Sequence, residues 1–435
     1  MKPELHDVVI IGAGTTGAAA AYHLAEAGVS NILCLEMGAV GQGRTAASRV
    51  PPGTPLIRGE ESVYAPYNSG TAVFDGGAKG PRTIKMIVTL PPYLMLEGFA
   101  DQHGWDGVRT YLELAIRGRN LQLELANKVL ANPAEQVKQC GSLMVCEPAR
   151  VQRLQQEFDD LQRLGCACEW WDRDQVVAAH GAAANFVAGI WFAGDARIDS
   201  VSYARALLEA ACATGAVTLR EHCPAVVNLA SDGADRPVTL QLADGTVLQA
   251  GRVIVATGGL HSDHHLAGVL TPRYSYLVAL PHRDPGAAGG MAAPDSANFF
   301  TFGFSHDWCV ADNFVRISGE DHYSGLKSPR ADERCGRLAR WGWQTYPYLE
   351  AEVDHPQKYG IYSETADFMP LVGTPHDDSR VCYLVGCNAW GQASLSAAAA
   401  LAPALLGYRE LTPEENATAR LFSIRRFSAR SRATA

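Results

Sequence analysis

The sequence has no excess of positive charge, which limits the partners that it can bind. It contains 37 lysines and arginines against 46 aspartates and glutamates, so its formal net charge is −9 at pH 7. A protein that neutralises nucleic-acid phosphates needs a basic surface. We therefore expect small-molecule partners and no binding of nucleic acid.

Long hydrophobic runs are also missing. The apolar runs, such as residues 7–11 and 253–256, have the length of strands, whereas a membrane-spanning helix needs about 20 apolar residues. The N-terminal stretch MKPELHDVVIIG lacks the basic, apolar and cleavage-site regions of a signal peptide in that order. The sequence thus predicts no membrane anchor and a cytoplasmic location.

The cysteines lack the spacing of a metal site. The chain has 11 of them, and the close pairs Cys140/Cys146 and Cys166/Cys168 have no second pair or histidine cluster at zinc spacing. A chain of this length is also too poor in cysteine for a disulfide framework. We expect reduced thiols and no metal.

What the sequence does contain is enough apolar residues for a large folded protein. Hydrophobic residues make up 47% of its 435 residues and charged residues 19%. Single cores stop growing at roughly 250–300 residues. Two or three lobes are therefore expected.

The N-terminal segment has the pattern of a nucleotide-binding βαβ unit. The β-branched run Val8–Ile11 predicts a buried strand, and the glycine-rich turn GAGTTG follows at residues 12–17. The alanine-rich residues 18–28 predict a helix, and the apolar residues 31–35 predict a second strand that ends at Glu36. This order is that of the dinucleotide-binding fingerprint.

The glycines of this turn have separate predicted tasks. Gly12 permits the tight turn, Gly14 lets the backbone approach a pyrophosphate, and Gly17 lets the helix pack closely on the strand. Glu36 lies about twenty residues further on, where a carboxylate accepts hydrogen bonds from a ribose hydroxyl. The adenosine half of FAD or of NAD fits this pattern.

The rest of the chain favours FAD. A glycine-, arginine- and proline-rich excursion follows Glu36, where a plain NAD dehydrogenase would continue with alternating strands and helices. Further on, the pattern predicts a helix at 199–214, a hairpin from 226 to 244 and a strand that runs into Ala-Thr-Gly-Gly at 256–259.

The C-terminal part predicts a second ligand-facing turn. A buried strand is expected at 381–385, a turn at 386–391 and an alanine-rich helix at 394–406. The positive end of that helix dipole points at whatever lies in the turn. Such a place suits the negative charge of a reduced flavin.

Together these motifs resemble the D-amino-acid oxidase/sarcosine oxidase family of FAD-dependent oxidoreductases. The resemblance rests on the fingerprint at 12–17, the loop GQGRTAAS at 41–48, Asp199 with its helix, VIVATGG at 253–259 and the Thr-Ala-Asp…Trp-Gly series from 365 to 391. The motifs cover nearly the whole chain and occur in the family's order.

The resemblance implies an α/β fold: a Rossmann-type FAD-binding domain with an α+β substrate lobe. The FAD-binding domain would be discontinuous, comprising residues 1–85, 186–260 and 350–435. Residues 86–185 and 261–349 would mainly form a substrate domain on a mixed or antiparallel sheet.

The resemblance also implies which residues contact FAD. They are Gly12, Gly14, Thr16, Gly17, Glu36, Arg44, Thr45, Ala47, Ser48, Val226, Thr257, Gly258, Gly386, Trp390, Gly391 and Gln392. Some relatives attach FAD covalently through a cysteine, and Gly360 stands at that position here. Cys309 and Cys387 are other candidates, although buried structural cysteines are the more common case. Non-covalent FAD is therefore expected.

The implied reaction is oxidation of a C–N bond. Hydride passes from the carbon beside an amine to flavin N5, an imine forms, and dioxygen becomes hydrogen peroxide. The expected catalytic residues are Arg316, Glu320, His322, Trp390 and Arg49. Arg316 stands where sarcosine-type relatives place an oxygen-activating lysine, and Glu320 where they place a histidine. The alternative for Arg316 is a surface ion pair with Glu320 or Asp321.

Other departures from the family leave the substrate open. Ala393 falls where sarcosine-type members use a lysine to hold a carboxylate. Either Arg44, Arg49 or Arg58 therefore binds a carboxylate, or the substrate lacks one there.

The insertion-like residues 70–96 are expected to form a lid, a dimer contact or an embellishment. The alternative hypotheses are an amine dehydrogenase with another electron acceptor and a non-catalytic flavin-binding subunit. The oligomeric state is open too.

Overall fold

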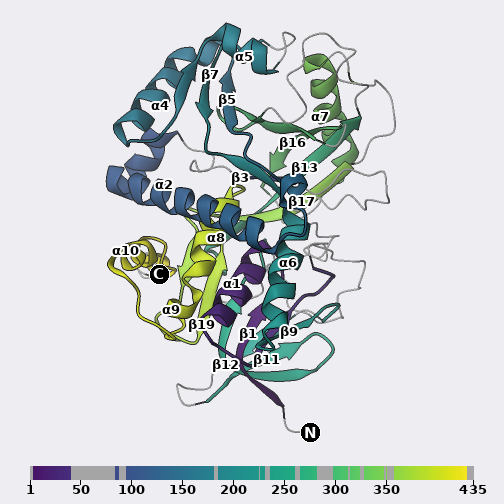
Figure 1. Ribbon diagram of the computed structural model, residues 1–435, viewed down its shortest axis with the longest axis vertical. Coiled ribbons are helices and arrows are strands. Elements are labelled where there is room, and N and C mark those ends of the chain that lie inside the picture. Colours follow the sequence, from purple (N-terminus) through teal and green to yellow (C-terminus); the bar gives the residue numbers. More distant parts are fainter. Residues whose placement is uncertain are drawn as a thin grey trace.

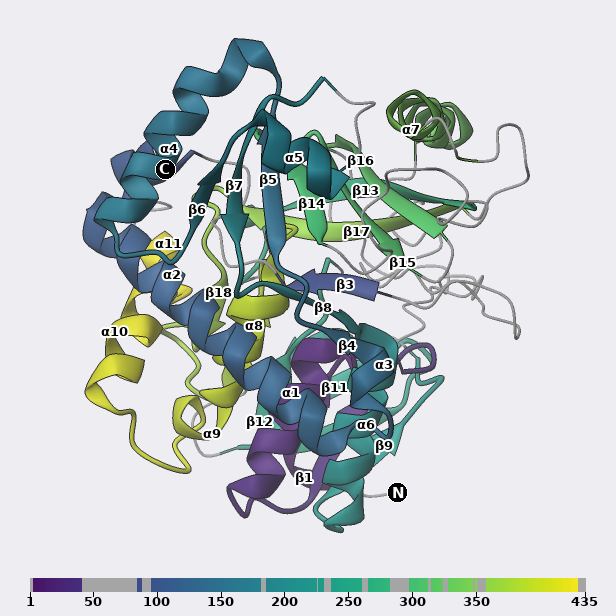
Figure 2. The same ribbon diagram turned by 45° about the horizontal axis from the view of Figure 1, so that its top comes forward.

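The protein consists of two lobes, one on each of two large sheets (Figures 1 and 2). The computed structural model describes residues 3–40, 84–87, 95–180, 185–224, 226–230, 236–259, 265–281, 297–311, 314–323, 328–346, 349 and 357–428. In Figure 1 the first lobe lies below the second, and helix α2 runs across the molecule between them.

The first lobe is built around a sheet in the strand order β10-β11-β12-β1-β2-β9, with β19 paired to β12 and β18 to β19. Strands β1, β2, β9, β12 and β19 are mutually parallel where they pair. The elements of this lobe are β1 (Glu4–Ile11), α1 (Thr15–Glu26), β2 (Ile32–Leu35), α6 (Ser200–Ala213), β9 (Val217–Arg220), β10 (Val226–Ala230), β11 (Val238–Leu242), β12 (Val247–Val255), β18 (Leu371–Gly373), β19 (Val381–Val385), α8 (Gly391–Ala400), α9 (Ala402–Leu405), α10 (Pro413–Leu421) and α11 (Arg425–Ser428).

Both faces of the parallel strands are buried, which explains the continuous β-branched run at 8–11. Val8 and Ile10 pack in the core cluster that includes the helix residues Ala20 and Leu207. Val9 points to the other face, where the hairpin of β10 and β11 supplies the cover. Alternate side chains of one strand thus enter two different cores.

The second lobe has a mixed sheet in the order β17-β13-β16-β15-β14-β5-β7-β6. Its elements are β5 (Ser142–Cys146), η1 (Pro148–Arg150), α4 (Val151–Arg163), β6 (Glu169–Trp171), α5 (Arg173–His180), β7 (Ala188–Phe192), β13 (Leu270–Pro281), β14 (Asn298–Thr301), β15 (His306–Ala311), β16 (Phe314–His322), α7 (Ala331–Thr345) and β17 (Gln357–Thr365). Helix α7 packs on one face, which we call the outer face, against Val278 and Ile317. The opposite, inner face carries Met144 and Phe300, which share a core cluster with the first lobe.

Helix α2 (Leu96–Val129) connects the lobes. It has a non-helical residue at Gly104 and packs against α8, where a Cβ on Gly118 would lie 1.9 Å from the Ala393 carbonyl oxygen. Nearby lie α3 (Pro133–Gln136) and a small sheet of β3 (Ile84–Ile87), β8 (Ala196–Asp199) and β4 (Val137–Lys138) in the order β3-β8-β4. Only a glycine permits this approach of α2 to α8.

Strands β7 and β17 lie in the second sheet. The boundaries expected at residues 186 and 350 had placed both strands in the FAD-binding domain. The difference arises because β7 leads into β8 of the small sheet and β17 into β18 of the first lobe, so the position of either strand in the chain does not reveal its sheet. Of the insertion-like residues 70–96, the description covers only 84–87, 95 and 96. No helix in the described part of the chain is long and apolar enough to cross a membrane.

Candidate FAD-dependent active site

Four parallel strands of the first lobe end at the same edge of their sheet. β1, β2, β12 and β19 lead there into Gly12, Glu36, the turn after Ala256 and Gly386, respectively. Ligands of open α/β sheets bind outside the carboxyl ends of the strands. Segments from the two ends and the middle of the sequence therefore meet at one candidate site.

Three glycines shape the turn between β1 and α1. Two of them lie in close contacts, and the third faces open space. Gly12 has φ +100°, and a Cβ there would lie 2.5 Å from the Ala256 carbonyl oxygen. A Cβ on Gly17 would lie 1.8 Å from the Gly12 oxygen, so helix and strand touch. At Gly14, the N-cap of α1, a Cβ would meet no described atom within 4 Å. Thr16 lies in the first turn of α1. The geometry leaves room above Gly14 at a helix N-terminus, where anions bind.

Glu36 is held against this turn by the backbone. Its carboxylate accepts hydrogen bonds from the N–H groups of Ala13 (3.0 Å) and Gly38 (2.9 Å). Burial raises the pKa of Glu36, and these N–H groups partly oppose that shift. The carboxylate thus lies next to the glycine turn, as a ribose-binding acid would.

The turn after β12 carries an unused polar atom. The Thr257 hydroxyl is buried and has no hydrogen-bond partner among the described residues. Gly258 has φ +63°, and its carbonyl oxygen accepts a hydrogen bond from the Ser363 hydroxyl (3.1 Å). A buried hydroxyl without a partner costs free energy, so a ligand that bonds to it is favoured.

The turn after β19 is fixed by Asn388. Asn388 and Ala389 have φ +47° and +68°, respectively. The Asn388 side-chain oxygen accepts from the Thr365 N–H (2.9 Å), and its amide donates to the Gly386 carbonyl oxygen (2.8 Å). Because an asparagine tolerates this left-handed conformation and bonds locally, it sets the direction in which α8 begins.

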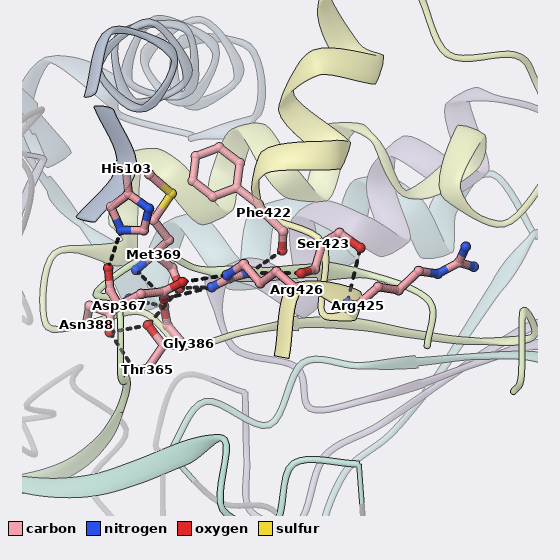
Figure 3. A network of polar contacts seen from close by, with 10 residues as sticks. All are labelled: His103, Thr365, Asp367, Met369, Gly386, Asn388, Phe422, Ser423, Arg425 and Arg426. Carbon is pink, nitrogen blue, oxygen red and sulfur yellow. Dashed lines mark hydrogen bonds and ion pairs between the residues drawn. The ribbon is translucent and has the colours of Figure 1, made fainter. Parts of the chain in front are cut away.

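A partly buried ion pair supports the same turn (Figure 3). Arg426 donates from Nε to one Asp367 oxygen (2.7 Å) and from Nη2 to the other (3.0 Å), and His103 bonds to the Asp367 carbonyl oxygen (2.8 Å). Burial alone would raise the pKa of Asp367, but the hydrogen bonds and charge of Arg426 lower it. The Thr-Ala-Asp motif at 365–367 is therefore a structural clamp on the turn.

The first residues of α8 face the second lobe. Trp390, the N-cap, packs against the rings of Phe300 (5.7 Å between centroids) and Phe304 (5.3 Å). Its indole N–H is buried and has no acceptor in the described part of the chain. Gly391 is buried, and Gln392 accepts a hydrogen bond from Gln122 of α2 (3.0 Å). An aromatic wall and an open donor thus stand at the α8 N-terminus.

Arg316 lies on the inner face of the second sheet. It is 3% exposed, so the alternative of a surface ion pair is wrong. Arg316 pairs with Cys309, and the next row pairs Ser318 with Asp307 and Asp307 with Phe300. Directly paired residues share a face, so the register places Arg316 on the same face as the ring that contacts Trp390.

Glu320 and His322 are not brought to that face. Glu320 has φ +57° and lies at a register shift between β13 and β16, and its carboxylate pairs with Arg334 (3.5 Å) and Arg337 (2.6 Å) of α7. The Arg337 hydrogen bond is the main cause that lowers the pKa of Glu320. The His322 ring lies 5.8 Å from that of Tyr276, in the outer core. The extra residue of the bulge turns both side chains toward α7.

A polar cluster at the other end of the inner face was missed by the sequence analysis. Arg273 pairs with Glu364 (2.8 Å), and its guanidinium lies 4.1 Å from the Tyr323 ring centroid. The Tyr362 hydroxyl donates to Asp321 (2.7 Å). Burial raises the pKa of Glu364, although Arg273 opposes the shift. Tyr362 lies two residues after Gly360, the position that was considered only for flavin attachment, so a signal in this part of the sequence could have pointed to the cluster.

Several expected site residues fall outside the description. Arg44, Thr45, Ala47, Ser48 and Arg49, with Arg58, lie in residues 41–83, of which the structure describes none.

The remaining expected residues have definite places. Val226 begins β10 and packs in the core with Leu33, and Cys223 just before it donates its N–H to the Glu36 carbonyl oxygen (2.9 Å). Ala393 is fully buried beside α2. Gly360 lies in β17. A contact of Val226 with a cofactor therefore stays a prediction.

Comparison with known families decides the class. Residues 7–404 match the model of the family described as DAO, FAD dependent oxidoreductase. The chain belongs to this family. None of the curated protein sequences compared with it matches.

Solved structures of this oxidoreductase fold resemble the whole chain. Glycine oxidase from Geobacillus kaustophilus has a TM-score of 0.70 and 17% identity, covering 97% of this chain and 99% of its own. L-proline dehydrogenase from P. horikoshii gives 0.65 and 15%, with coverages of 98% and 99%. L-α-glycerophosphate oxidase from Mycoplasma pneumoniae, with FAD bound, gives 0.66 and 18%, with coverages of 93% and 96%. At these identities the likeness shows the fold.

FAD is the cofactor of the family, and the described residues fit it. Gly14 leaves the space that a pyrophosphate requires at a helix N-terminus, and Glu36 lies beside it. Thr257 and Trp390 offer buried polar atoms without partners in the described ranges. These unused groups line up along one sheet edge, as an extended dinucleotide needs.

Proposed function

We propose that this oxidoreductase oxidises the C–N bond of a small amine or amino acid to an imine, with dioxygen as the electron acceptor and hydrogen peroxide as the product. Bound FAD supplies the two-electron redox chemistry, and its attachment is non-covalent, as Gly360 predicts. The observation that carries the proposal is the buried Arg316 guanidinium on the inner face, on the same face as the Phe300 ring that contacts Trp390 and two strands away from it.

Each residue has a defined task in this proposal. Trp390 provides an aromatic wall and an N–H donor that orient the substrate. Arg316 provides a fixed positive charge that stabilises developing negative charge, including that on dioxygen as it accepts an electron. A guanidinium keeps its proton at all working pH values, so Arg316 acts by charge and not as a base. Glu320 and His322 have no part in this set because of their outward positions.

The test uses stopped flow to measure the two half-reactions of the Arg316→Met variant separately. These are reduction of the flavin by substrate and its reoxidation by dioxygen. Unit charges about 4 Å apart interact by about 4 kcal/mol at an effective dielectric of 20, an upper scale for the loss. Reoxidation by dioxygen should slow strongly, while anaerobic reduction by substrate changes little. Arg337→Met is the matched control, because Arg337 pairs with Glu320 on the outer face. A variant that slows only reduction makes Arg316 a substrate ligand, and one that slows neither removes it from the site.

An amine dehydrogenase is the second candidate, since lysine, the usual oxygen-activating residue, is absent at position 316. The two activities differ in the fate of the electrons. An oxidase turning over a panel of primary, secondary and amino-acid amines in air releases one peroxide per imine. Turnover that requires an added dye and yields no peroxide identifies the dehydrogenase, and no turnover with any amine favours a non-catalytic flavin-binding subunit.

A further inference from the structure

Two cysteines lie together at the far edge of the second sheet, away from the proposed active site. Cys166 and Cys168 occupy the link between α4 and β6, the outermost strand of that sheet. Figure 2 shows β6 beside β7, below α4. Both thiols are half-buried. Nothing in the proposed reaction uses them.

The link between α4 and β6 keeps the two cysteines close together. Gly165 has φ +76°, and the Cys166 N–H donates to the Leu161 carbonyl oxygen (2.9 Å), which ends α4. The Gln162 side chain donates to the Cys168 carbonyl oxygen (2.9 Å) and lies 3.5 Å from its Sγ. Residues two apart in a chain have Cα atoms within about 7 Å of each other, close to the range that a disulfide spans.

The surroundings make the two thiols unequal. The hydrogen bond from the Cys166 thiol lowers the pKa of Cys168, and Gln162 adds to this effect against the opposing burial and the charge of Glu169. The pKa of Cys166 is raised by the same hydrogen bond, by burial and by the nearby Asp195 carboxylate, with Arg119 opposing. Thiolate is the reactive form of cysteine. The lower pKa of Cys168 favours it as the attacking thiol, with Cys166 as the resolving thiol.

We propose that Cys166 and Cys168 form a redox-active dithiol that hydrogen peroxide oxidises to an intramolecular disulfide. The Cys168 thiolate attacks one peroxide oxygen, the O–O bond breaks, and the departing hydroxide takes up a proton to become water. The resulting sulfenic acid is attacked by the Cys166 sulfur. The S–O bond breaks, and its hydroxide leaves as water with the thiol proton. Two thiols lose two electrons, and one peroxide becomes two waters.

The test uses the holoenzyme and added hydrogen peroxide. Tryptic cleavage after Arg163 and Arg173 releases residues 164–173, LGCACEWWDR, which contain both cysteines and no other. After one equivalent of peroxide and alkylation, this peptide should lack both alkyl groups and weigh two hydrogens less than the reduced form. Cys168→Ser should abolish that product, and Cys166→Ser should leave a sulfenic acid on Cys168 that dimedone traps. Cys212→Ser, at a half-buried thiol elsewhere, is the matched control and should form the disulfide like the wild type.

A peptide that keeps both alkyl groups after peroxide overturns the proposal, as does a disulfide between either residue and another cysteine. The idea that turnover supplies the peroxide rests on the proposed oxidase function. A second experiment tests it by incubating the holoenzyme with an amine substrate in air, with and without catalase, which removes the peroxide. A disulfide that forms with added peroxide but not during turnover supports the dithiol and contradicts the oxidase function. The two proposals therefore fail separately.

Discussion

Gly14→Ala should separate cofactor binding from folding. Gly14 has φ −71°, which alanine adopts freely, and a Cβ there would meet nothing within 4 Å. Alanine is a poorer N-cap than glycine by up to about 1 kcal/mol, while the reduced freedom of the unfolded chain returns about 0.4–1 kcal/mol. The apoprotein should therefore melt within a few degrees of the wild type.

The same methyl group would stand where the pyrophosphate approaches the helix N-terminus. Displacing one hydrogen bond to a charged phosphate costs about 1.5–3 kcal/mol, which is about 10- to 150-fold in Kd. Titration of the apoprotein with FAD, followed by quenching of flavin fluorescence, measures this loss. Gly17→Ala should behave in the opposite way and destabilise the apoprotein itself, because its Cβ would lie 1.8 Å from the Gly12 oxygen.

Gly98→Ala is the matched control for Gly14→Ala. It also adds a methyl to open space, but in α2, and should leave the FAD titration unchanged. A Gly14→Ala titration that superimposes on that of the wild type would falsify the position of the pyrophosphate. An apoprotein that melts far below the wild type would instead show that the open space at Gly14 has a structural role.

Three further outcomes are expected. Acid precipitation should release FAD into the supernatant, because Gly360 provides no thiol for covalent attachment. Yellow colour that stays in the pellet would contradict non-covalent attachment. Burial raises the pKa of Glu157 from 4.5 to about 7. Its contribution to stability is therefore complete below pH 4.5 and is lost, by up to ~3 kcal/mol, as the pH rises to about 7. Glu157→Gln should flatten the decline in Tm between pH 5 and 7, and an equal decline in both proteins contradicts this origin. Asp367→Asn breaks the partly buried ion pair with Arg426 and should cost about 1.5–3 kcal/mol in urea unfolding, whereas a loss below 1 kcal/mol would show that the clamp on the turn is weak.

Helices and strands were predictable where the sequence has a single hydrophobic period and clear signals for the ends of the element. The βαβ unit, the helix after Asp199, the hairpin and the strand at 381–385 are confirmed as β1, α1, β2, α6, β10, β11 and β19. The helix expected at 394–406 is present, but it starts at Gly391 and divides at Leu401 before Pro403. The proline lacks the N–H that an uninterrupted helix requires.

The placement of side chains on the second sheet was not predictable from spacing. Arg316 and Glu320 are four residues apart, and a strand of period two would direct both to one face. The bulge at Glu320, which has a positive φ, directs the side chains from that point to the face opposite to the one that a regular strand would give. Gly319 is a local signal for a bulge, but its position depends on the register with Tyr274 and Tyr276 in a strand more than forty residues earlier.

The first-lobe sheet also has a consequence for the order in which the protein is made. Its strand β12 pairs with β1, more than two hundred residues earlier, and with β19, more than a hundred residues later. Ribosomes add about 5–20 residues per second, so the Gly386 turn emerges roughly 20–80 s after the glycine fingerprint. About 130 residues separate the paired parts of β12 and β19, so the β12 edge that receives β19 stays unpaired for roughly 6–26 s. The turn at Gly386, one of the four segments at the candidate site, is therefore added only late in synthesis.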